Sequence, residues 1–218
     1  MREKFLVVQL VRHAESAANA GGVIKDPAEI PLSAKGEKQA YDFGQAIPKA
    51  PAQIICSPFL RARQTAAPIA RRFGLSLEIW PVQEFTYLAP ERCVNTTVVQ
   101  RRAWVEDYWR RANPDSVDGP GAESFAQLIG RIEATLTRLA ESQISGWILM
   151  VGHGQFMQAL RWYIAQRPGP LTKEHLDSFR QLDHAAPIEN CSGYELRRRF
   201  LSDTAKPFGW YVSSGRQL

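Results

Sequence analysis

The chain of 218 residues carries a formal net charge of +5, with 44% apolar, 10% aromatic and 22% charged residues. This length and apolar content suit a single α/β domain over residues 1–218 and argue against a disordered chain. No apolar run approaches the roughly 18–20 residues that cross a bilayer, and the run at 5–11 is too short for a signal peptide. We therefore expect a cytoplasmic protein without a membrane partner.

The cysteines and basic residues indicate neither a metal site nor a nucleic-acid surface. Cys56, Cys93 and Cys191 are odd in number and widely spaced without a CxxC pair, so we expect small buried side chains rather than a disulfide framework or structural zinc. Basic residues cluster only in "QRRAWVEDYWRRAN" and "LRRRF", which solvated helix faces explain best. We predict no metal, no cofactor and no nucleic-acid partner.

Predicted strands and helices alternate along most of the chain. In order they are a strand at 5–12, a helix from Ser33 to about Ile47, a strand at 53–57, a helix after Pro58, a strand at 75–80, a helix beginning near Glu123, a strand at 147–152, a helix from about Gln155 to Gln166, and strands at 192–198 and 207–213. The first four strands are typical of strands buried on both faces, and the last two suit positions nearer an edge. This order predicts a three-layer α/β/α sandwich with a mainly parallel central sheet.

Two helix starts carry local signals, and one segment interrupts the alternation. Ser33 is a typical N-cap, and Ser124 with Gln127 has the spacing of a capping box. The stretch 88–122 contains prolines, a helix-like part rich in Trp, Tyr and Arg, and "DGPGAES". We interpret it as an insertion that covers the functional site rather than as a separate domain.

Reactive side chains follow three of the predicted strands. "VRHAES" ends the first, "CSPFLRARQT" follows the second and "VGHGQ" follows the fourth. Because ligands collect at the carboxyl ends of parallel strands, we expect Arg12, His13, Arg61 and His153 to meet at one edge of the sheet. Any one of them alone would more often be structural, but convergence from three strand ends favours a shared site.

This set of side chains suits phosphoryl transfer. Arginine forks match phosphoryl oxygens, and a neutral imidazole is a competent nucleophile. Nearby cations lower the pKa of a histidine and so help to keep it neutral. The second histidine can donate a hydrogen bond to the oxygens that carry charge in the transition state.

Four motifs occur in a fixed order between about residues 5 and 198: "LVRHAES" with Asn19, "SPFLRARQTA", "GAES" and "VGHG". Together they resemble the signature set of the histidine phosphatase superfamily, also called phosphoglycerate mutase-like. The resemblance implies the phosphoglycerate mutase-like fold and a histidine, His13, that becomes phosphorylated. It implies that Arg12, Arg61 and His153 form the phosphate pocket and that Asn19 adds a further polar contact.

The resemblance also implies a proton donor after the third strand, where Glu84 in "WPVQEFTYL" is the matching carboxylate. A carboxyl near a bound phosphate dianion has its pKa raised toward neutrality, which suits protonation of a leaving alkoxide. We interpret Glu15 and Glu123 as supporting or capping residues. After Glu84 the chain reads "FTYLAPERC" where the family often has a glycine and a Trp-Glu-Gly element, so this region assigns no substrate.

The leading hypothesis is a metal-independent phosphomonoester hydrolase of the histidine acid phosphatase type, with a phosphohistidine on His13 and Glu84 as proton donor. Two alternatives stay open: a cofactor-dependent phosphoglycerate mutase and a non-catalytic module that binds phosphorylated ligands. A cysteine phosphatase would need Cys-x5-Arg, but Ala62 stands at that position after Cys56. His13 with Glu15 is too sparse for a metallohydrolase.

The expected substrate is a small phosphorylated metabolite. Five arginines of the insertion either recognise a second anionic group or cover a helix face: Arg92, Arg101, Arg102, Arg110 and Arg111. Trp104 and Tyr108 have the i, i+4 spacing of core packing, and exposed aromatics near Trp109 would leave room for a homodimer. His175 and His184 fall outside every motif, and we interpret them as structural or surface residues.

Overall fold

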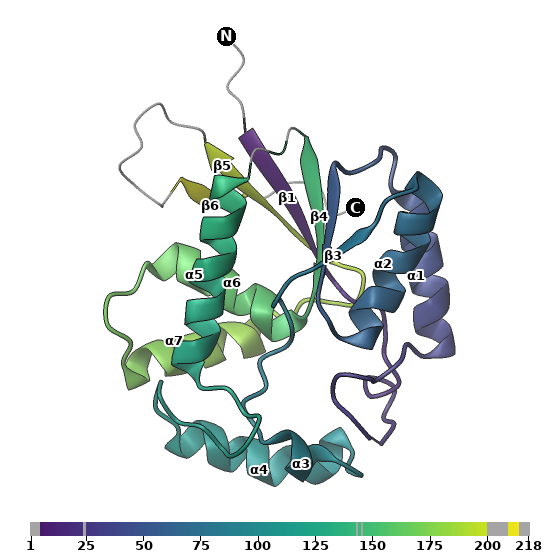
Figure 1. The fold of residues 1–218 in the computed structure, drawn as a ribbon. Coiled ribbons are helices and arrows are strands. Elements are labelled where there is room, and N and C mark those ends of the chain that lie inside the picture. Colours follow the sequence, from purple (N-terminus) through teal and green to yellow (C-terminus); the bar gives the residue numbers. More distant parts are fainter. Residues whose placement is uncertain (1–4, 24, 143, 145, 200–208, 214–218) are drawn as a thin grey trace.

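One mixed sheet organises the computed structural model, which describes residues 5–23, 25–142, 144, 146–199 and 209–213 (Figure 1). Within these residues the six strands lie in the order β3-β2-β4-β1-β5-β6. They are β1 (Phe5–Arg12), β2 (Gln53–Cys56), β3 (Leu77–Ile79), β4 (Trp147–Gly152), β5 (Gly193–Arg199) and β6 (Trp210–Ser213). The first four are parallel, whereas β5 and β6 are antiparallel to their neighbours, so the predicted mainly parallel sheet is confirmed.

Helices cover both faces of this sheet (Figure 1). One face carries α1 (Ala34–Ala46) and α2 (Leu60–Phe73). The other carries α5 (Phe125–Glu141) and α6 (Gly154–Gln166), with α7 (Lys173–Ala185) packed against α6. The three-layer α/β/α sandwich is therefore confirmed. No helix in the described part of the chain is long and apolar enough to span a membrane.

The core consists of an apolar layer on each face of the sheet. Val11 and Ile54 pack toward α1 and α2, while their neighbours Leu10 and Ile55 pack toward α5 and α6. Successive strand residues point to opposite faces, which is why the central strands are continuously apolar. β3 differs from the prediction because it lies at the sheet edge, where Ile79 is 49% exposed. β6 begins at Trp210, and residues 207–208 of the predicted last strand lie outside the described residues.

The two predicted helix starts are found where the local signals place them. The Ser33 hydroxyl accepts a hydrogen bond from the Gly36 amide at 3.0 Å, and Ser124 and Gln127 form a reciprocal capping box. Gly36 is required because a Cβ there would lie 1.9 Å from the carbonyl oxygen of Glu15. The first turn of α1 therefore packs directly on the loop that follows β1.

α7 is absent from the predicted elements. Its apolar stripe is short, with Leu176 and Phe179 buried and Leu182 half-buried. That i, i+3, i+6 spacing is the signal from which the helix could have been predicted. His175 takes part in the capping box at the start of α7, and His184 is exposed, so both have the structural or surface positions expected.

The segment 88–122 contains α3 (Pro90–Cys93) and α4 (Val98–Arg111) and lies beyond the carboxyl ends of the parallel strands (Figure 1). Tyr108 belongs to the core and Trp104 packs against it, as predicted. The expectation of exposed aromatics near Trp109 is wrong, because its side chain is only 7% exposed. Phe179 of α7 covers it, with the ring centroids 6.1 Å apart, so this argument for a homodimer falls away.

Candidate active site

Three neighbouring parallel strands bring the predicted residues together. His13 follows β1, His153 follows β4, and Arg61 lies in the first turn of α2, just after β2. The two imidazole rings lie with their centroids 5.0 Å apart, and the Arg61 guanidinium contacts both. The carboxyl edge of the sheet therefore holds a compact group of two imidazoles and a guanidinium.

The hydrogen bonds of His13 assign its tautomer. Its Nδ1 lies 2.7 Å from the carbonyl oxygen of Ala14, which can only accept, so Nδ1 carries the proton. Its Nε2 lies 3.1 Å from Nε of Arg61, which can only donate, so Nε2 has a free electron pair. The ring is thus fixed with its unprotonated nitrogen facing a cation.

His153 is held in the complementary way. Nη2 of Arg61 donates to its Nδ1 at 3.2 Å, so the ring proton is on Nε2, which donates to the Ser57 hydroxyl at 2.8 Å. In this tautomer Nδ1 accepts a hydrogen bond, so the predicted donation to a phosphoryl oxygen requires a proton on Nδ1. Ser57, which directly follows β2, orients the ring and was not among the predicted site residues.

Both histidines are neutral at physiological pH. Burial lowers the pKa of His13 from 6.5 to about 3, and the charges of Arg61 and Arg12 add to the effect. Burial and the Arg61 charge likewise hold the pKa of His153 well below its ordinary value. A neutral His13 is what a nitrogen nucleophile needs, so its protonation does not limit attack above about pH 4.

We expect these two histidines to make the fold sensitive to acid. Their folded-state pKa values lie below 6.5, so the unfolded chain binds more protons once the pH falls below about 6.5. The stability that they contribute is fully present above that pH and is lost as the pH falls toward about 3, by up to about 1.4 kcal/mol per pH unit for each histidine.

Urea unfolding of the wild type and of His153→Asn, at pH 6.5 and at about pH 5, measures this effect. Glu84 titrates in the opposite direction, because its folded-state pKa is raised, but it is present in both proteins. The variant should lose less unfolding free energy than the wild type between the two pH values. An equal loss in both proteins would show that His153 is not held neutral.

Arg61 is a buried cation fixed by three protein groups. Besides its contacts with the two histidines, its Nη1 donates to the carbonyl oxygen of Pro27 at 2.8 Å, and the residue is only 7% exposed. Burial lowers its pKa to about 10, so it stays charged at neutral pH. Its position suits a planar fork that binds two oxygens of one phosphoryl group.

Arg61→Lys is expected to lower kcat/KM about 10²- to 10³-fold, because one ammonium group cannot replace a fork that contacts three partners. Steady-state hydrolysis of a phosphate monoester measures the loss. Arg63→Lys is the matched control, since Arg63 lies on the same helix in a more exposed ion pair with Glu29. Similar activities for the two variants would show that Arg61 does not bind the phosphoryl group.

Arg12 supplies the second guanidinium. Its Nη1 donates to the carbonyl oxygen of Ile188 at 2.6 Å, whereas its Nε is buried and has no hydrogen-bond partner within the described residues. A buried donor without a partner is costly. The unpaired Nε therefore suits an oxyanion ligand, and its charge also contributes to the low pKa of both histidines.

Glu84 lies at the N-terminus of α6. Its Oε1 accepts hydrogen bonds from the amides of Phe85, Gln155 and Phe156 at 3.2, 2.9 and 3.3 Å. Burial raises the pKa of this carboxyl above its ordinary value, although the charges of Arg61 and Arg12 oppose the shift. All three hydrogen bonds use Oε1, so a proton on Oε2 leaves them intact. The residue is therefore suited to hold and transfer a proton.

Neighbouring residues fix the loop that carries Glu84. Arg131 and Glu123 form a half-buried pair with N–O distances of 2.5 and 2.8 Å, and Arg131 also donates to the carbonyl oxygen of Pro81 at 2.6 Å. The Glu123 amide donates to the carbonyl oxygen of Thr86 at 2.8 Å. Glu123 therefore supports this loop, and Ser124 is the residue that caps α5.

α7 adds a further contact that the sequence did not reveal. Asp183 accepts a hydrogen bond at 2.9 Å from the side chain of Gln155, whose backbone amide binds Glu84. The charge of Asp183 also contributes to the raised pKa of Glu84. Asp183 thus acts on the candidate proton donor both through Gln155 and through space.

Asn19 lies in the loop that follows His13. Its Oδ1 accepts hydrogen bonds from the amide and hydroxyl of Ser16, at 3.2 and 3.1 Å. Asn190, which was not predicted, donates to the carbonyl oxygen of His13 at 2.7 Å and lies 3.5 Å from Oδ1 of Asn19. Asn19 therefore orders the loop, and its contact with a phosphoryl group stays a prediction. Glu15 supports the same loop through Ser33.

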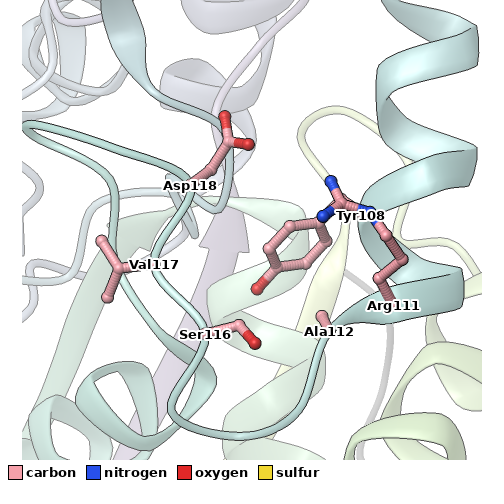
Figure 2. A pocket seen from close by; sticks show the side chains of 6 residues that line it. All are labelled: Tyr108, Arg111, Ala112, Ser116, Val117 and Asp118. Atoms are coloured by element: carbon pink, nitrogen blue, oxygen red, sulfur yellow. The ribbon is translucent and has the colours of Figure 1, made fainter.

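A cavity of about 430 Å³ lies beside these groups and is lined by Arg61, Glu84 and Gln155. The 88–122 segment forms part of its wall. A second cavity, of about 370 Å³, lies at the end of α4 around Tyr108 (Figure 2). Its two charged residues, Arg111 and Asp118, are both paired with other side chains. It contains none of the predicted site residues.

The cysteines and the acidic residues do not suggest another catalytic centre. Burial raises the pKa of the Cys56 thiol to about 12, so this thiol is protonated and unreactive. Among the residues that the structure describes, no group of three or more His, Cys, Asp or Glu side chains is placed to hold a metal ion.

Comparison with known proteins assigns the family. Residues 8–196 match the sequence profile of the histidine phosphatase superfamily, branch 1. The chain belongs to this superfamily. A curated relative from Citrobacter koseri, named a probable phosphoglycerate mutase (GpmB), is 34% identical over 158 residues, which cover 68% of this chain and 70% of the relative. The family resemblance predicted from the four motifs is confirmed.

Solved structures show the same histidine phosphatase fold. A mycobacterial glucosyl-3-phosphoglycerate phosphatase has a TM-score of 0.70 and 22% identity, and the match covers 97% of each chain. The alpha-ribazole phosphatase from Shigella flexneri has a TM-score of 0.67 and 21% identity over 95% of each chain. The phosphoglycerate mutase-like fold is therefore confirmed, and the candidate site lies at the carboxyl edge of its sheet.

Proposed function

We propose that this histidine phosphatase hydrolyses phosphate monoesters through a phosphohistidine intermediate on His13, without a metal ion. One observation carries the proposal. Nδ1 of His13 donates to the carbonyl oxygen of Ala14, so the unprotonated Nε2 faces the guanidinium of Arg61 in a buried site. A nucleophile with a free electron pair thus lies beside a cation that attracts phosphoryl oxygens.

In the first step, phosphoryl oxygens replace the histidine nitrogens as hydrogen-bond acceptors for Arg61. They also accept a hydrogen bond from the unpaired Nε of Arg12. Nε2 of His13 then attacks phosphorus, and the bond from phosphorus to the leaving oxygen breaks. Glu84 donates its proton to that oxygen, so the product leaves as a neutral alcohol. The two guanidiniums stabilise the charge on the oxygens in the transition state.

In the second step, the Glu84 carboxylate takes a proton from water. The water oxygen attacks phosphorus, and the bond between phosphorus and Nε2 breaks. Inorganic phosphate leaves, His13 returns to its neutral tautomer and Glu84 is again protonated. The raised pKa of Glu84 supports both roles, because a carboxyl whose pKa lies nearer neutrality is an effective acid and an effective base.

Hydrolysis of 4-nitrophenyl phosphate by enzyme treated with excess chelator tests this proposal. We expect steady release of phosphate and 4-nitrophenolate that the chelator does not reduce. Absence of turnover at every pH between about 5 and 8, in a folded protein that binds inorganic phosphate, would contradict a general phosphatase and favour a mutase or a non-catalytic phospho-ligand module.

A phosphoglycerate mutase is the second candidate, because the 34% identical relative carries that name. A mutase returns the phosphoryl group to a phosphoglycerate, whereas a hydrolase releases it to water. Incubation with 3-phosphoglycerate and a catalytic amount of 2,3-bisphosphoglycerate separates the two. Formation of 2-phosphoglycerate faster than phosphate would favour the mutase, and phosphate without 2-phosphoglycerate would favour the hydrolase.

A further inference from the structure

We infer that the alcohol part of the substrate is largely apolar and carries at most one anionic group. This substrate class rests on the proposed hydrolysis at His13. The cavity of about 430 Å³ is lined by Arg61, which binds the phosphoryl oxygens in the proposed reaction, and by Glu84, which protonates the leaving oxygen. The group that leaves phosphorus must therefore occupy this cavity.

The walls of the cavity are mainly apolar. They come from the loop before α1, the start of α2, the loop after Glu84 and the insertion, and include Ile30, Phe59, Phe85, Leu88, Val98 and Val105. Apolar surface of this kind gains free energy by covering apolar ligand atoms. The uncharged polar side chains of the lining are already paired: Thr86 with the Glu84 carbonyl, Tyr87 with Trp109 and Gln155 with Asp183. The hydroxyl groups of a sugar acid or a polyol would therefore find few free partners in this cavity.

Few charges face this cavity. Apart from Arg61 and Glu84, the only charged residue among its described lining residues is Arg101, whose Nη1 donates to the carbonyl and hydroxyl oxygens of Thr96 at 3.1 and 3.0 Å. A second phosphate or carboxylate would have Arg101 as its one added cation and would be repelled by an ionised Glu84. More than one further anion would therefore be poorly compensated.

The other four arginines of the insertion do not line the cavity. Three of them form ion pairs along α4: Arg102 pairs with Glu106, and Arg110 and Arg111 both pair with Asp107. The fourth, Arg92, pairs with Asp118. These contacts support the interpretation that they cover a helix surface. The basic composition of the insertion therefore does not make the cavity a site for a multiply charged metabolite.

Val98, in the first turn of α4, is an exposed part of the apolar wall. It lines the cavity yet is 58% exposed, so core packing does not explain its apolar side chain. Val99 follows it in the same turn, is 81% exposed and is not a lining residue. The two valines thus differ in cavity contact but share residue type, helix turn and exposure to solvent.

Three phosphate esters of primary alcohols test the substrate class: 2-phenylethyl phosphate, glycerol 3-phosphate and 3-phosphoglycerate. Their leaving groups are all primary alkoxides, so differences in kcat/KM report mainly the fit of the alcohol part. We expect 2-phenylethyl phosphate to exceed the other two by about tenfold or more. Equal or faster hydrolysis of 3-phosphoglycerate would overturn this inference while leaving the proposed phosphatase intact. Failure of all three and of 4-nitrophenyl phosphate would overturn both.

Val98→Asp and Val99→Asp locate the effect in the cavity. Both place an acid in the first turn of α4, where it is compatible with the helix. Val98→Asp should lower kcat/KM for 2-phenylethyl phosphate about tenfold, by analogy with other mismatches in apolar pockets, and leave glycerol 3-phosphate within about twofold. Val99→Asp should leave both unchanged. Indistinguishable variants would show that the alcohol part binds elsewhere and would overturn the inference.

Discussion

His13→Ala is expected to abolish turnover of every phosphate monoester, with a fall in kcat of about 10⁵-fold or more. The reason is that Nε2 of His13, which is unprotonated and faces the Arg61 guanidinium, is the atom that attacks phosphorus in the proposed mechanism. Arg12, Arg61 and Glu84 remain in the variant, so it should still bind inorganic phosphate. Phosphate release by the purified variant, with excess chelator present, measures the loss.

His184→Ala is the matched control for this variant, because His184 is exposed on α7 and outside the site. It should retain wild-type kcat. Far-UV circular dichroism and urea unfolding of His13→Ala separate loss of the nucleophile from loss of the fold. A folded His13→Ala enzyme that kept more than about a hundredth of the wild-type kcat would show that another group attacks phosphorus.

Glu84→Gln is expected to separate the two chemical steps. The amide can keep the hydrogen bonds from the α6 amides through Oε1 but cannot transfer a proton. With 4-nitrophenyl phosphate, whose leaving group needs no proton, the first step should survive and the second should slow about 10²- to 10⁴-fold. Stopped-flow absorbance should therefore show a burst of nitrophenolate equal to the enzyme concentration, followed by slow turnover.

The same variant should change the pH dependence with 2-phenylethyl phosphate. In the proposed mechanism Glu84 must be protonated to release an alkoxide, and burial raises its pKa. Activity is therefore present at low pH and is lost as the pH rises through that raised pKa, whereas Glu84→Gln should have a low rate without this alkaline decrease. Glu78→Gln, an exposed control, should match the wild type. An unchanged profile in Glu84→Gln would assign the proton to another group.

The central part of the site was predictable because topology alone places it. Arg12 and His13 end one buried strand, Arg61 follows a second and His153 follows a third. The carboxyl ends of adjacent parallel strands meet whatever the packing details are. The helix starts at Ser33 and Ser124 were predictable for a different reason, because their capping contacts are local and span only three residues.

Contacts between distant segments were not predictable in this way. The bond from His153 to Ser57 depends on the orientation of a ring, and Glu84 meets the N-terminus of α6 across 71 residues of sequence. Asp183 reaches the site only because α7 packs against α6, and the apolar stripe of that helix is short. Such contacts follow from packing, which spacing along the chain does not encode.

The 88–122 segment shows a further difference between composition and structure. Its five arginines suggest an anion site, but Arg102 and Arg111 stand four residues from the acids with which they pair, Glu106 and Asp107. That i, i+4 spacing can be read from the sequence, and it predicts that these arginines are paired with acids and are not available to bind an anion. The apolar wall around Val98 is assembled from segments that lie far apart in the sequence, around Ile30, Phe59 and Phe85, so the sequence did not reveal it.

Trapping the phosphorylated enzyme tests the proposed mechanism most directly. Glu84→Gln, treated with chelator, would be mixed with 4-nitrophenyl phosphate, quenched in alkali during slow turnover and analysed by peptide mass spectrometry. We predict close to one phosphoryl group per chain, on His13, stable in alkali and lost in acid, and absent when His13→Ala is added to the variant. Phosphate on another residue, or a complete lack of phosphorylated His13 while nitrophenolate is released in a burst, would contradict the phosphohistidine mechanism.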